Sequence, residues 1–194
     1  MFERAIINAR LGDGHFWQHP RDTNACLVYT SIHEDWLRWK QQNLLVSGQS
    51  AIACTRKANA KGCYPNAKPL YTLKSYGHAE ITQAKQGYTR ELALTHMDLL
   101  DLAIWYIDDG CCHIRKDGPG LRIFLCVGAL AKEQLFPQIQ RLFGTSLLGR
   151  VIKNNSKATE NNKSWVIPKP IAVQIMARAH EIAPECLQYK TPQW

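Results

Sequence analysis

The chain repeats one order of predicted elements twice, and this duplication limits its fold more than any other feature. Each copy runs helix, two strands, helix, two strands and helix, judged by apolar spacing of about 3.6 residues in helices and of two in strands. An Asp-Gly pair closes the first helix of each copy, at Asp13–Gly14 and at Asp109–Gly110. The pattern predicts an α+β fold with antiparallel sheets, duplicated in tandem, with halves at residues 1–94 and 95–194.

The expected elements can be placed along both copies. Helices are expected at residues 6–14, 32–45 and 79–86, and then at 102–110, 129–144 and 172–184. The clearest strands are expected at residues 25–31, 50–57 and 68–76, and then at 121–128, 146–155 and 163–168. Because Trp36, Trp39 and Trp105 lie in predicted helices, the six tryptophans are expected to anchor the core rather than to form exposed stacking surfaces.

The charge of the chain points to an anionic partner. Its 24 Lys and Arg residues exceed its 16 acids, which gives a formal charge of +8. For so basic a domain the first expectation is nucleic acid and the second is a membrane surface. No run of about 18 apolar residues and no signal-peptide pattern is present. The expected location is therefore intracellular, in the cytoplasm or nucleoid, or in an organelle matrix, and not secreted.

The seven cysteines form neither a CxxC pair nor the Cys/His spacing of a zinc site. Their number is odd, and three of them lie in apolar runs. Buried free thiols in a reducing compartment are therefore favoured over disulfides.

The stretch LAIWYIDDG, residues 102–110, places two carboxylates at the end of an apolar helix. Asp108 and Asp109 could be solvated acids, with Gly110 as a left-handed helix cap. The negative end of the helix dipole disfavours acids there by a few tenths of a kcal/mol or more. A bound cation would offset that repulsion, since hard cations such as Mg²⁺ prefer oxygen ligands.

Three segments of the chain resemble one family. They are IINARLGDGHF at residues 6–16, LAIWYIDDG at 102–110, and APECLQYKTP at 183–192. They resemble the LAGLIDADG homing endonucleases, in the single-chain branch with two motif copies, and the likeness extends over essentially all 194 residues. Asn8 and Arg10 depart from the family habit, which has small or apolar residues at those positions.

The resemblance implies a pseudo-twofold pair of αββαββα units with saddle-shaped sheets and two central motif helices. It implies that Asp13 and Asp109 bind Mg²⁺, for which Mn²⁺ can substitute, and that they bring it to the scissile phosphates. Gly12 and Asp108 occupy the preceding position in each motif and are the further candidates for metal contact. Two carboxylates brought together need such a cation to remain charged.

A basic residue beside each acid would polarise the attacking water or stabilise the transition state. The family tail points to Lys190 in the second half. In the first half the counterpart is expected to follow that half's last helix, and Lys85 in QAKQGY fits best.

Recognition of DNA is expected from the strands, whose alternate side chains can enter a major groove. Basic residues cluster in the predicted strands and strand loops, and the candidates are Arg21, Arg56, Lys57, Lys61, Lys68, Lys74, Arg115, Lys116, Arg122, Arg150, Lys153, Lys157 and Lys163.

These features together predict a monomeric, Mg²⁺-dependent, site-specific double-strand DNA endonuclease, a phosphodiester hydrolase with a long, non-palindromic target. The resemblance implies intron or intein mobility and cleavage across the minor groove with short 3′ overhangs. Two alternatives share the fold: an RNA maturase that assists splicing of its host intron, and a DNA-binding regulator without nuclease activity. Asn8 and Arg10 are the residues that favour the regulator. An unrelated basic α+β protein is the remaining alternative.

Overall fold

The computed structural model describes residues 2–56, 68–114, 120–153 and 162–192. The chain divides into two compact units, Met1–Ala93 and Leu94–Trp194. The division falls inside a short helix, α4 (Arg90–His96), close to the boundary predicted after residue 94. Each unit is described by itself below.

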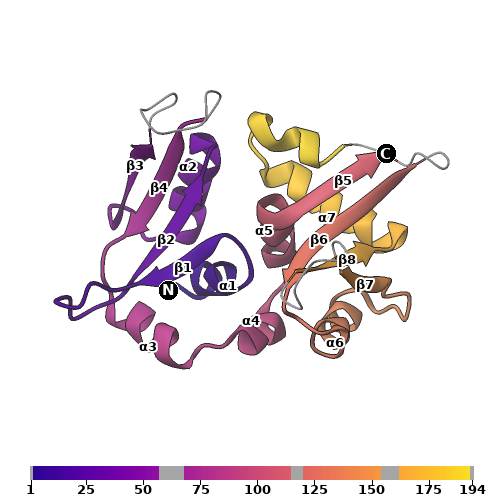
Figure 1. Cartoon of the computed structure of the whole chain (residues 1–194), viewed down its shortest axis with the longest axis horizontal. Coiled ribbons are helices and arrows are strands. Elements are labelled where there is room, and N and C mark those ends of the chain that lie inside the picture. Colours follow the sequence, from indigo (N-terminus) through magenta and orange to yellow (C-terminus); the bar gives the residue numbers. More distant parts are fainter. Residues whose placement is uncertain (1, 57–67, 115–119, 154–161, 193–194) are drawn as a thin grey trace. The chain divides into compact units, whose positions relative to one another are not determined.

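The first unit contains a four-stranded antiparallel sheet with helices on one side (Figure 1). The strand order is β1-β2-β4-β3. The elements in chain order are α1 (Glu3–Leu11), β1 (Gly14–Trp17), β2 (Cys26–Ser31), α2 (Glu34–Leu44), β3 (Ser50–Arg56), β4 (Leu70–Ser75) and α3 (Ala79–Gly87).

The second unit repeats this arrangement with the strand order β5-β6-β8-β7. It adds a short 3₁₀ helix, η1, at its end. The elements are α5 (Leu99–Asp109), β5 (Gly110–Ile114), β6 (Leu121–Gly128), α6 (Lys132–Phe143), β7 (Arg150–Lys153), β8 (Lys163–Ile167), α7 (Lys169–Ile182) and η1 (Glu185–Lys190). The predicted fold class and element order are confirmed, and α4 is an additional helix that the sequence did not predict.

The two sheets also share one pairing register. Gly14 pairs with Tyr29 in the first sheet, and Gly110 pairs with Leu125 in the second. Lys74 lies opposite Val28 in the first sheet, just as Val166 lies opposite Phe124 in the second. These positions of one sheet therefore have equivalents in the other, and Asp13 and Asp109 both precede the first residue of an edge strand.

Alternating burial fixes which side of each sheet is covered. In the first unit Leu27, Tyr29 and Leu73 are fully buried on the side that packs against α1 and α2. The Tyr29 hydroxyl donates to the Ala5 carbonyl of α1 at 2.7 Å, which ties the sheet to that helix. In the second unit Leu125 is one of the residues that fill the same side.

α5 forms the centre of the second unit's core. The Asp98 side chain accepts from the Asp101 N–H at 2.9 Å, and Asp101 accepts from the Asp98 N–H at 3.0 Å, so a reciprocal capping box starts the helix. Residues 101–107 are all buried. A helix that is apolar on every side belongs inside a core, and α5 packs closely against α7.

The longest helix in the described part of the chain, α7, has 14 residues, and none of the described helices could cross a lipid bilayer. Six cysteines lie in the described ranges and all are free thiols. Of these six, Cys26 is buried, Cys112 and Cys126 are half-buried, and the others are exposed, so the expectation of buried thiols is wrong for most of them.

Candidate functional site

The two predicted acids occupy equivalent places at the ends of the motif helices. α5 ends at Asp109 itself, whereas α1 ends at Leu11, so Asp13 lies in the link to β1 and not in the helix. Asp13 is exposed, and Asp108 and Asp109 are half-buried. All three carboxyl groups can therefore reach a ligand outside the core.

The glycine after each acid is required for space, not for a left-handed turn. Gly110 has φ −83° and ψ 155°, so it is not the left-handed cap considered from sequence. A Cβ on Gly110 would collide with the ring and carbonyl of Tyr106. A Cβ on Gly14 would lie 2.7 Å from the Ala9 Cα. In both units the strand therefore starts directly against the helix that carries the motif.

Lys190 lies at the end of α5. Its ammonium donates to the carbonyl of Ile107 at 2.7 Å and to that of Asp108 at 3.1 Å. The Tyr106 hydroxyl donates in return to the Lys190 carbonyl at 2.9 Å, and burial raises the pKa of that hydroxyl. The lysine thus satisfies carbonyls that lack partners within the helix, and it opposes the negative end of the dipole beside the two acids.

The first unit has a basic residue at the equivalent carbonyl, but it is not Lys85. Arg90 donates to the Leu11 carbonyl in a long contact of 3.5 Å. The ammonium of Lys85 instead contacts the Gln18 side chain at 3.1 Å. The counterpart was expected to follow the last helix of the half; Arg90 follows α3, whereas Lys85 lies inside α3, and the geometry favours Arg90 over Lys85 as the counterpart of Lys190.

The two unusual residues of α1 have different environments. The Arg10 guanidinium lies 4.2 Å from the centroid of the Phe16 ring and donates to the carbonyls of Ala84 and Lys85 at the end of α3. Partial burial lowers the pKa of this guanidinium. Asn8 is only 1% exposed, and neither atom of its side-chain amide has a hydrogen-bond partner among the described residues.

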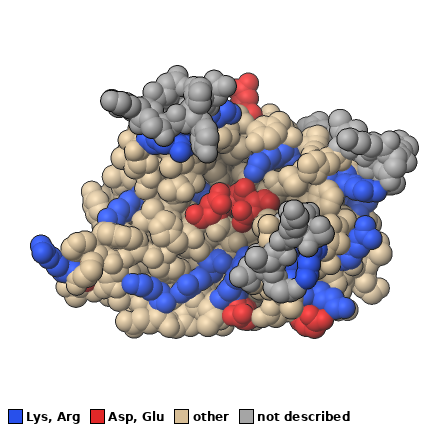
Figure 2. Space-filling view, in the orientation of Figure 1, with Lys and Arg blue, Asp and Glu red and all other residues tan. Residues whose placement is uncertain are grey.

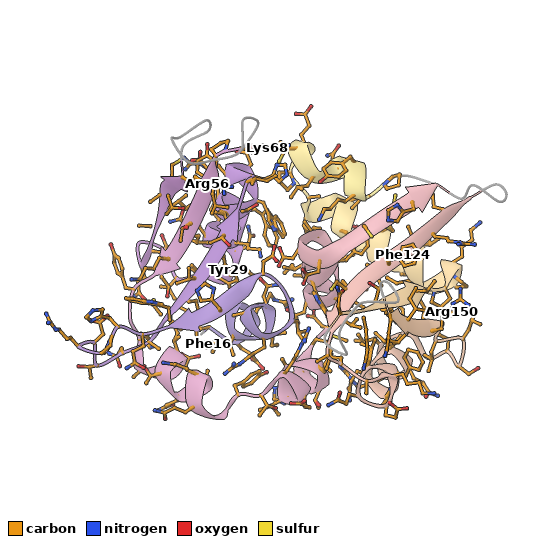
Figure 3. All side chains as sticks on the ribbon, viewed as in Figure 1. Phe16, Tyr29, Arg56, Lys68, Phe124 and Arg150 are labelled. Carbon is orange, nitrogen blue, oxygen red and sulfur yellow. The ribbon has the colours of Figure 1, made fainter. Side chains whose placement is uncertain are left out.

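The basic candidates of the DNA-binding prediction lie in different places on their sheets. On the exposed side of their sheets lie Lys74, opposite Val28 and Ala51, and Arg122, between half-buried Leu121 and buried Ile123 of β6. Figure 3 shows Arg56 and Lys68 near adjoining ends of β3 and β4. Arg21 and Arg150 are also exposed, and Figure 2 shows basic side chains over the visible face of each unit. Outside the described residues lie Lys57, Lys61, Arg115, Lys116 and Lys157.

Lys153 and Lys163 do not match the groove-facing prediction. They pair with each other at one end of β7 and β8, and alternation places them on the same side of the sheet as buried Trp165. With Leu130 and Lys132 they line a hollow of about 240 Å³ beside the start of α6. The sequence could not reveal this, because it does not specify which side of a sheet a strand-end lysine faces.

A similar architecture occurs in a solved structure entitled "The homing endonuclease I-WcaI bound to its DNA recognition sequence". The likeness has a TM-score of 0.72 and covers 98% of this chain and 85% of that one, at 16% sequence identity. The chain has a homing endonuclease fold.

Curated proteins with sequence similarity carry a different name. Two proteins named RecA, from Mycolicibacterium chitae and Mycolicibacterium flavescens, align with 66% of this chain. Their sequence identity over the aligned residues is 28% and 27%, respectively. The chain spans about a third of the length of these relatives, 32% in both cases. No protein-family model matches the chain.

Two side chains on the exposed face of this homing endonuclease fold were missed from sequence. Trp17 is 38% exposed on β1, although the tryptophans were expected in the core. Its ring contacts the Lys74 ammonium. No sequence signal separated Trp17 from the core tryptophans; the structure shows the alternation along residues 14–17, in which Phe16 is more covered than either neighbour. Asp22 lies in the loop that follows, which was interpreted only as a turn.

Proposed function

We propose that this chain is a site-specific endonuclease that hydrolyses phosphodiester bonds of double-stranded DNA. The observation that carries the proposal is the equivalence of Asp13 and Asp109. Asp109 ends its motif helix and Asp13 lies just after its own, and each precedes a glycine that pairs with the same position of the second strand. The fold itself is shared with a homing endonuclease whose structure contains its DNA recognition sequence.

Mg²⁺ is the proposed cofactor, and the donor set fits it. Asp13 and Asp109 offer carboxylate oxygens, and within the described ranges no three His, Cys, Asp or Glu side chains gather into a metal cluster. Mg²⁺ commonly binds through one or two carboxylates plus substrate phosphates and waters, so a site completed by DNA suits this chain. When bound, the ion would activate water and neutralise charge on the phosphate.

Asp108 and Gly12 contribute less to this site in the proposal. The Asp108 carbonyl already accepts from the Lys190 ammonium, and a cation beside it would repel a second one. Gly12 has no side chain, so it can offer only its main-chain carbonyl. The first shell of protein ligands would therefore consist of the two equivalent acids.

Lys190 and Arg90 are the proposed basic partners of the two acids. Each binds a carbonyl in the last turn of a motif helix, at Ile107 and at Leu11. From there a cation can stabilise charge that develops on the phosphate. Lys190 has two short contacts and Arg90 one long contact, so the two halves would not be equally active.

The target would be long and non-palindromic, because equivalent positions on the two exposed sheet faces carry different residues. Trp17 corresponds to His113, and Lys74 corresponds to Val166. A sheet that presents an aromatic and a lysine cannot read the same bases as one that presents a histidine and a valine.

Intron or intein association is part of the proposal. Its support is that the similar RecA proteins are about three times as long as the matched part of the chain, so the likeness concerns a segment within a longer protein. An endonuclease carried inside a host protein would give such a segment.

The test is cleavage of a DNA target selected from a randomised duplex pool by binding to the purified protein. With Mg²⁺ the wild-type protein should cut both strands, and EDTA should stop the reaction. Asp13→Asn and Asp109→Asn should each abolish double-strand cleavage while binding is kept. Asp35→Asn, at an exposed acid on α2, is the matched control and should cut normally.

Other outcomes would identify the alternatives. Tight, specific binding without cutting in Mg²⁺ or Mn²⁺ would indicate a DNA-binding regulator. Rescue of splicing of a host intron RNA, with no cutting of DNA, would indicate a maturase.

A further inference from the structure

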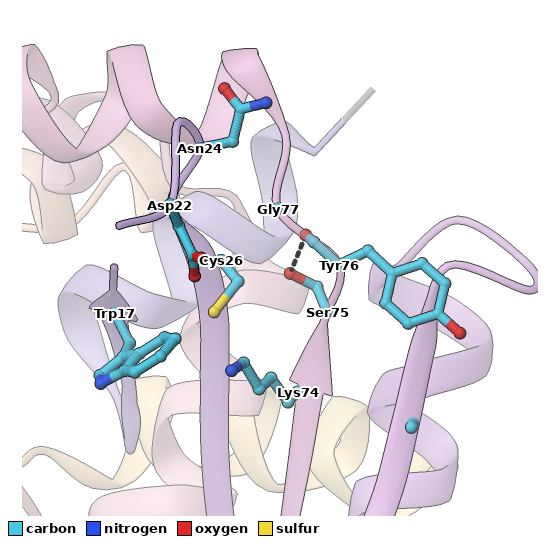
Figure 4. Close-up of a pocket in the computed structure, with 9 residues that line it drawn as sticks. Trp17, Asp22, Asn24, Cys26, Lys74, Ser75, Tyr76 and Gly77 are labelled. Atoms are coloured by element: carbon cyan, nitrogen blue, oxygen red, sulfur yellow. Dashed lines mark hydrogen bonds between the residues drawn. The ribbon is translucent and has the colours of Figure 1, made fainter. Parts of the chain in front are cut away.

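A pocket of about 340 Å³ opens on the exposed side of the first sheet, apart from the two acids (Figure 4). Strands β1, β2, β3 and β4 and the loop after β1 all contribute to it. The lining residues that matter here are Trp17, Asp22, Cys26, Ala51 and Lys74.

The Lys74 ammonium is held over the Trp17 ring, 3.7 Å from its centroid. Trp17 pairs with Cys26, and Lys74 lies opposite Val28, so the two side chains are diagonal neighbours on one face. A cation–π contact of this kind restricts a flexible lysine. Because the ammonium covers that face of the ring, the ring positions the lysine there and does not stack on a base.

The pocket presents one charged donor and one charged acceptor that do not pair with each other. Among the described residues, the Lys74 ammonium has no hydrogen-bond acceptor and the Asp22 carboxylate has no donor. Both charges nevertheless act on the Cys26 thiol between them: Asp22 and burial raise its pKa, whereas Lys74 lowers it. A ligand that offers an acceptor and a donor on one edge would satisfy both groups.

We propose that Lys74 and Asp22 read one G·C base pair in the major groove, and that Trp17 is the positioning residue for Lys74. This rests on the proposed DNA-binding function. Guanine presents two acceptors, N7 and O6, which suit an ammonium, and the cytosine amino group beside them suits a carboxylate. Adenine presents N7 but a donor in place of O6, so it gives the lysine one acceptor fewer.

The position of this pair follows from the strand. Asp13 precedes β1 and Trp17 ends it, so the pocket lies roughly 13 Å from Asp13 along the chain at 3.3 Å per residue. At 3.4 Å per base pair that is about four base pairs from the phosphate that Asp13 would serve.

The test compares selected DNA sites and then single substitutions in them. Full-length protein selects duplexes from a randomised pool in EDTA, so that cleavage does not remove bound sequences. Wild type should prefer G·C over A·T at one position by roughly 5- to 150-fold. Lys74→Met and Asp22→Asn should each reduce that preference toward one while preferences elsewhere in the site stay unchanged. Lys132→Met, at an exposed lysine on α6, is the control and should keep every preference.

Two further measurements separate positioning from a general effect on folding or charge. Trp17→Phe, which retains a ring, should keep most of the preference, and Trp17→Leu should lose it. Replacing that guanine with 7-deazaguanine should weaken binding of wild type and leave Lys74→Met unaffected.

The proposal is overturned if Lys74→Met weakens binding to all sequences equally, because that result indicates a phosphate contact. It is also overturned if 7-deazaguanine has the same effect on both proteins. Wild type that binds no duplex would overturn this inference and the proposed function together, whereas specific binding without a lysine effect would overturn only this inference.

Discussion

Asn8 is the residue whose chemistry fits its surroundings least well. Its side-chain amide is buried in α1, and neither polar atom has a hydrogen-bond partner among the described residues. Burial without compensation costs such a group about 1–3 kcal/mol. A small or apolar side chain at this position would avoid that cost.

Asn8→Ala should therefore stabilise the protein. Loss of the uncompensated amide should raise the free energy of unfolding by about 1 kcal/mol, since a small cavity offsets part of the gain. Thermal unfolding should show a Tm higher by roughly 2–4 °C. Asn43→Ala is the control, because the exposed Asn43 amide does have a partner, the Trp39 carbonyl at 2.8 Å. A lower Tm for Asn8→Ala would show that the Asn8 amide is satisfied in solution, for example by water.

At the scale of elements, the link between η1 and α5 places a basic group at the end of a motif helix. Lys190 donates to two carbonyls of α5, and Tyr106 of α5 donates back to the Lys190 carbonyl. This reciprocal arrangement explains how α5 can end in two acids. A cation from the protein opposes the negative end of the helix dipole whether or not a metal is bound.

Lys190→Met should weaken this link measurably. Removal of two charge-assisted hydrogen bonds from a partly exposed site should lower the free energy of unfolding by about 1–2 kcal/mol. Urea unfolding followed by circular dichroism measures the change, and Lys190→Arg should restore part of it. Lys132→Met is the matched control at an exposed lysine. Equal stability of Lys190→Met and wild type would contradict a structural role for the ammonium.

The sequence predicted the helices and their site residues well where the apolar periodicity and the motif agree. It predicted them less well where contacts between elements determine which side chain reaches the site. The helix before Asp109 and the tail lysine were predicted and lie together. Arg90 was missed because no local pattern reveals that its guanidinium reaches the Leu11 carbonyl. Trp17 was assigned to the core because residue type alone does not say which side of a sheet a side chain occupies.

At the scale of the whole molecule, the duplication was predictable because both halves repeat the same order of helices and strands. The shared pairing register was not predictable, because the apolar pattern of a strand does not specify which residue of the neighbouring strand lies opposite each of its residues. The chain has a formal charge of +8, and some of its basic side chains, such as Lys74 and Arg122, lie at exposed positions of the strands. Those positions can contact phosphates or base edges, while the covered sides of the sheets hold the core.

DNA binding should accordingly depend steeply on salt. About ten phosphate contacts would lower affinity by roughly 10³ to 10⁵ between 50 and 200 mM salt, as counterions are released on binding. Fluorescence anisotropy with a labelled selected duplex at four salt concentrations measures the slope. A slope near zero would contradict a binding surface built from the basic strand residues.

We propose above that Asp13 and Asp109 bind divalent metal at the DNA to be cut, and crystals of the protein bound to a selected duplex test this central proposal most directly. Soaked with Mn²⁺, they should give an anomalous scattering peak about 2.1 Å from a carboxylate oxygen of each of the two aspartates, with scissile phosphate oxygens completing the shell. A peak held by other residues, or two aspartates too far apart to share the ion or ions of one cleavage site, would contradict it.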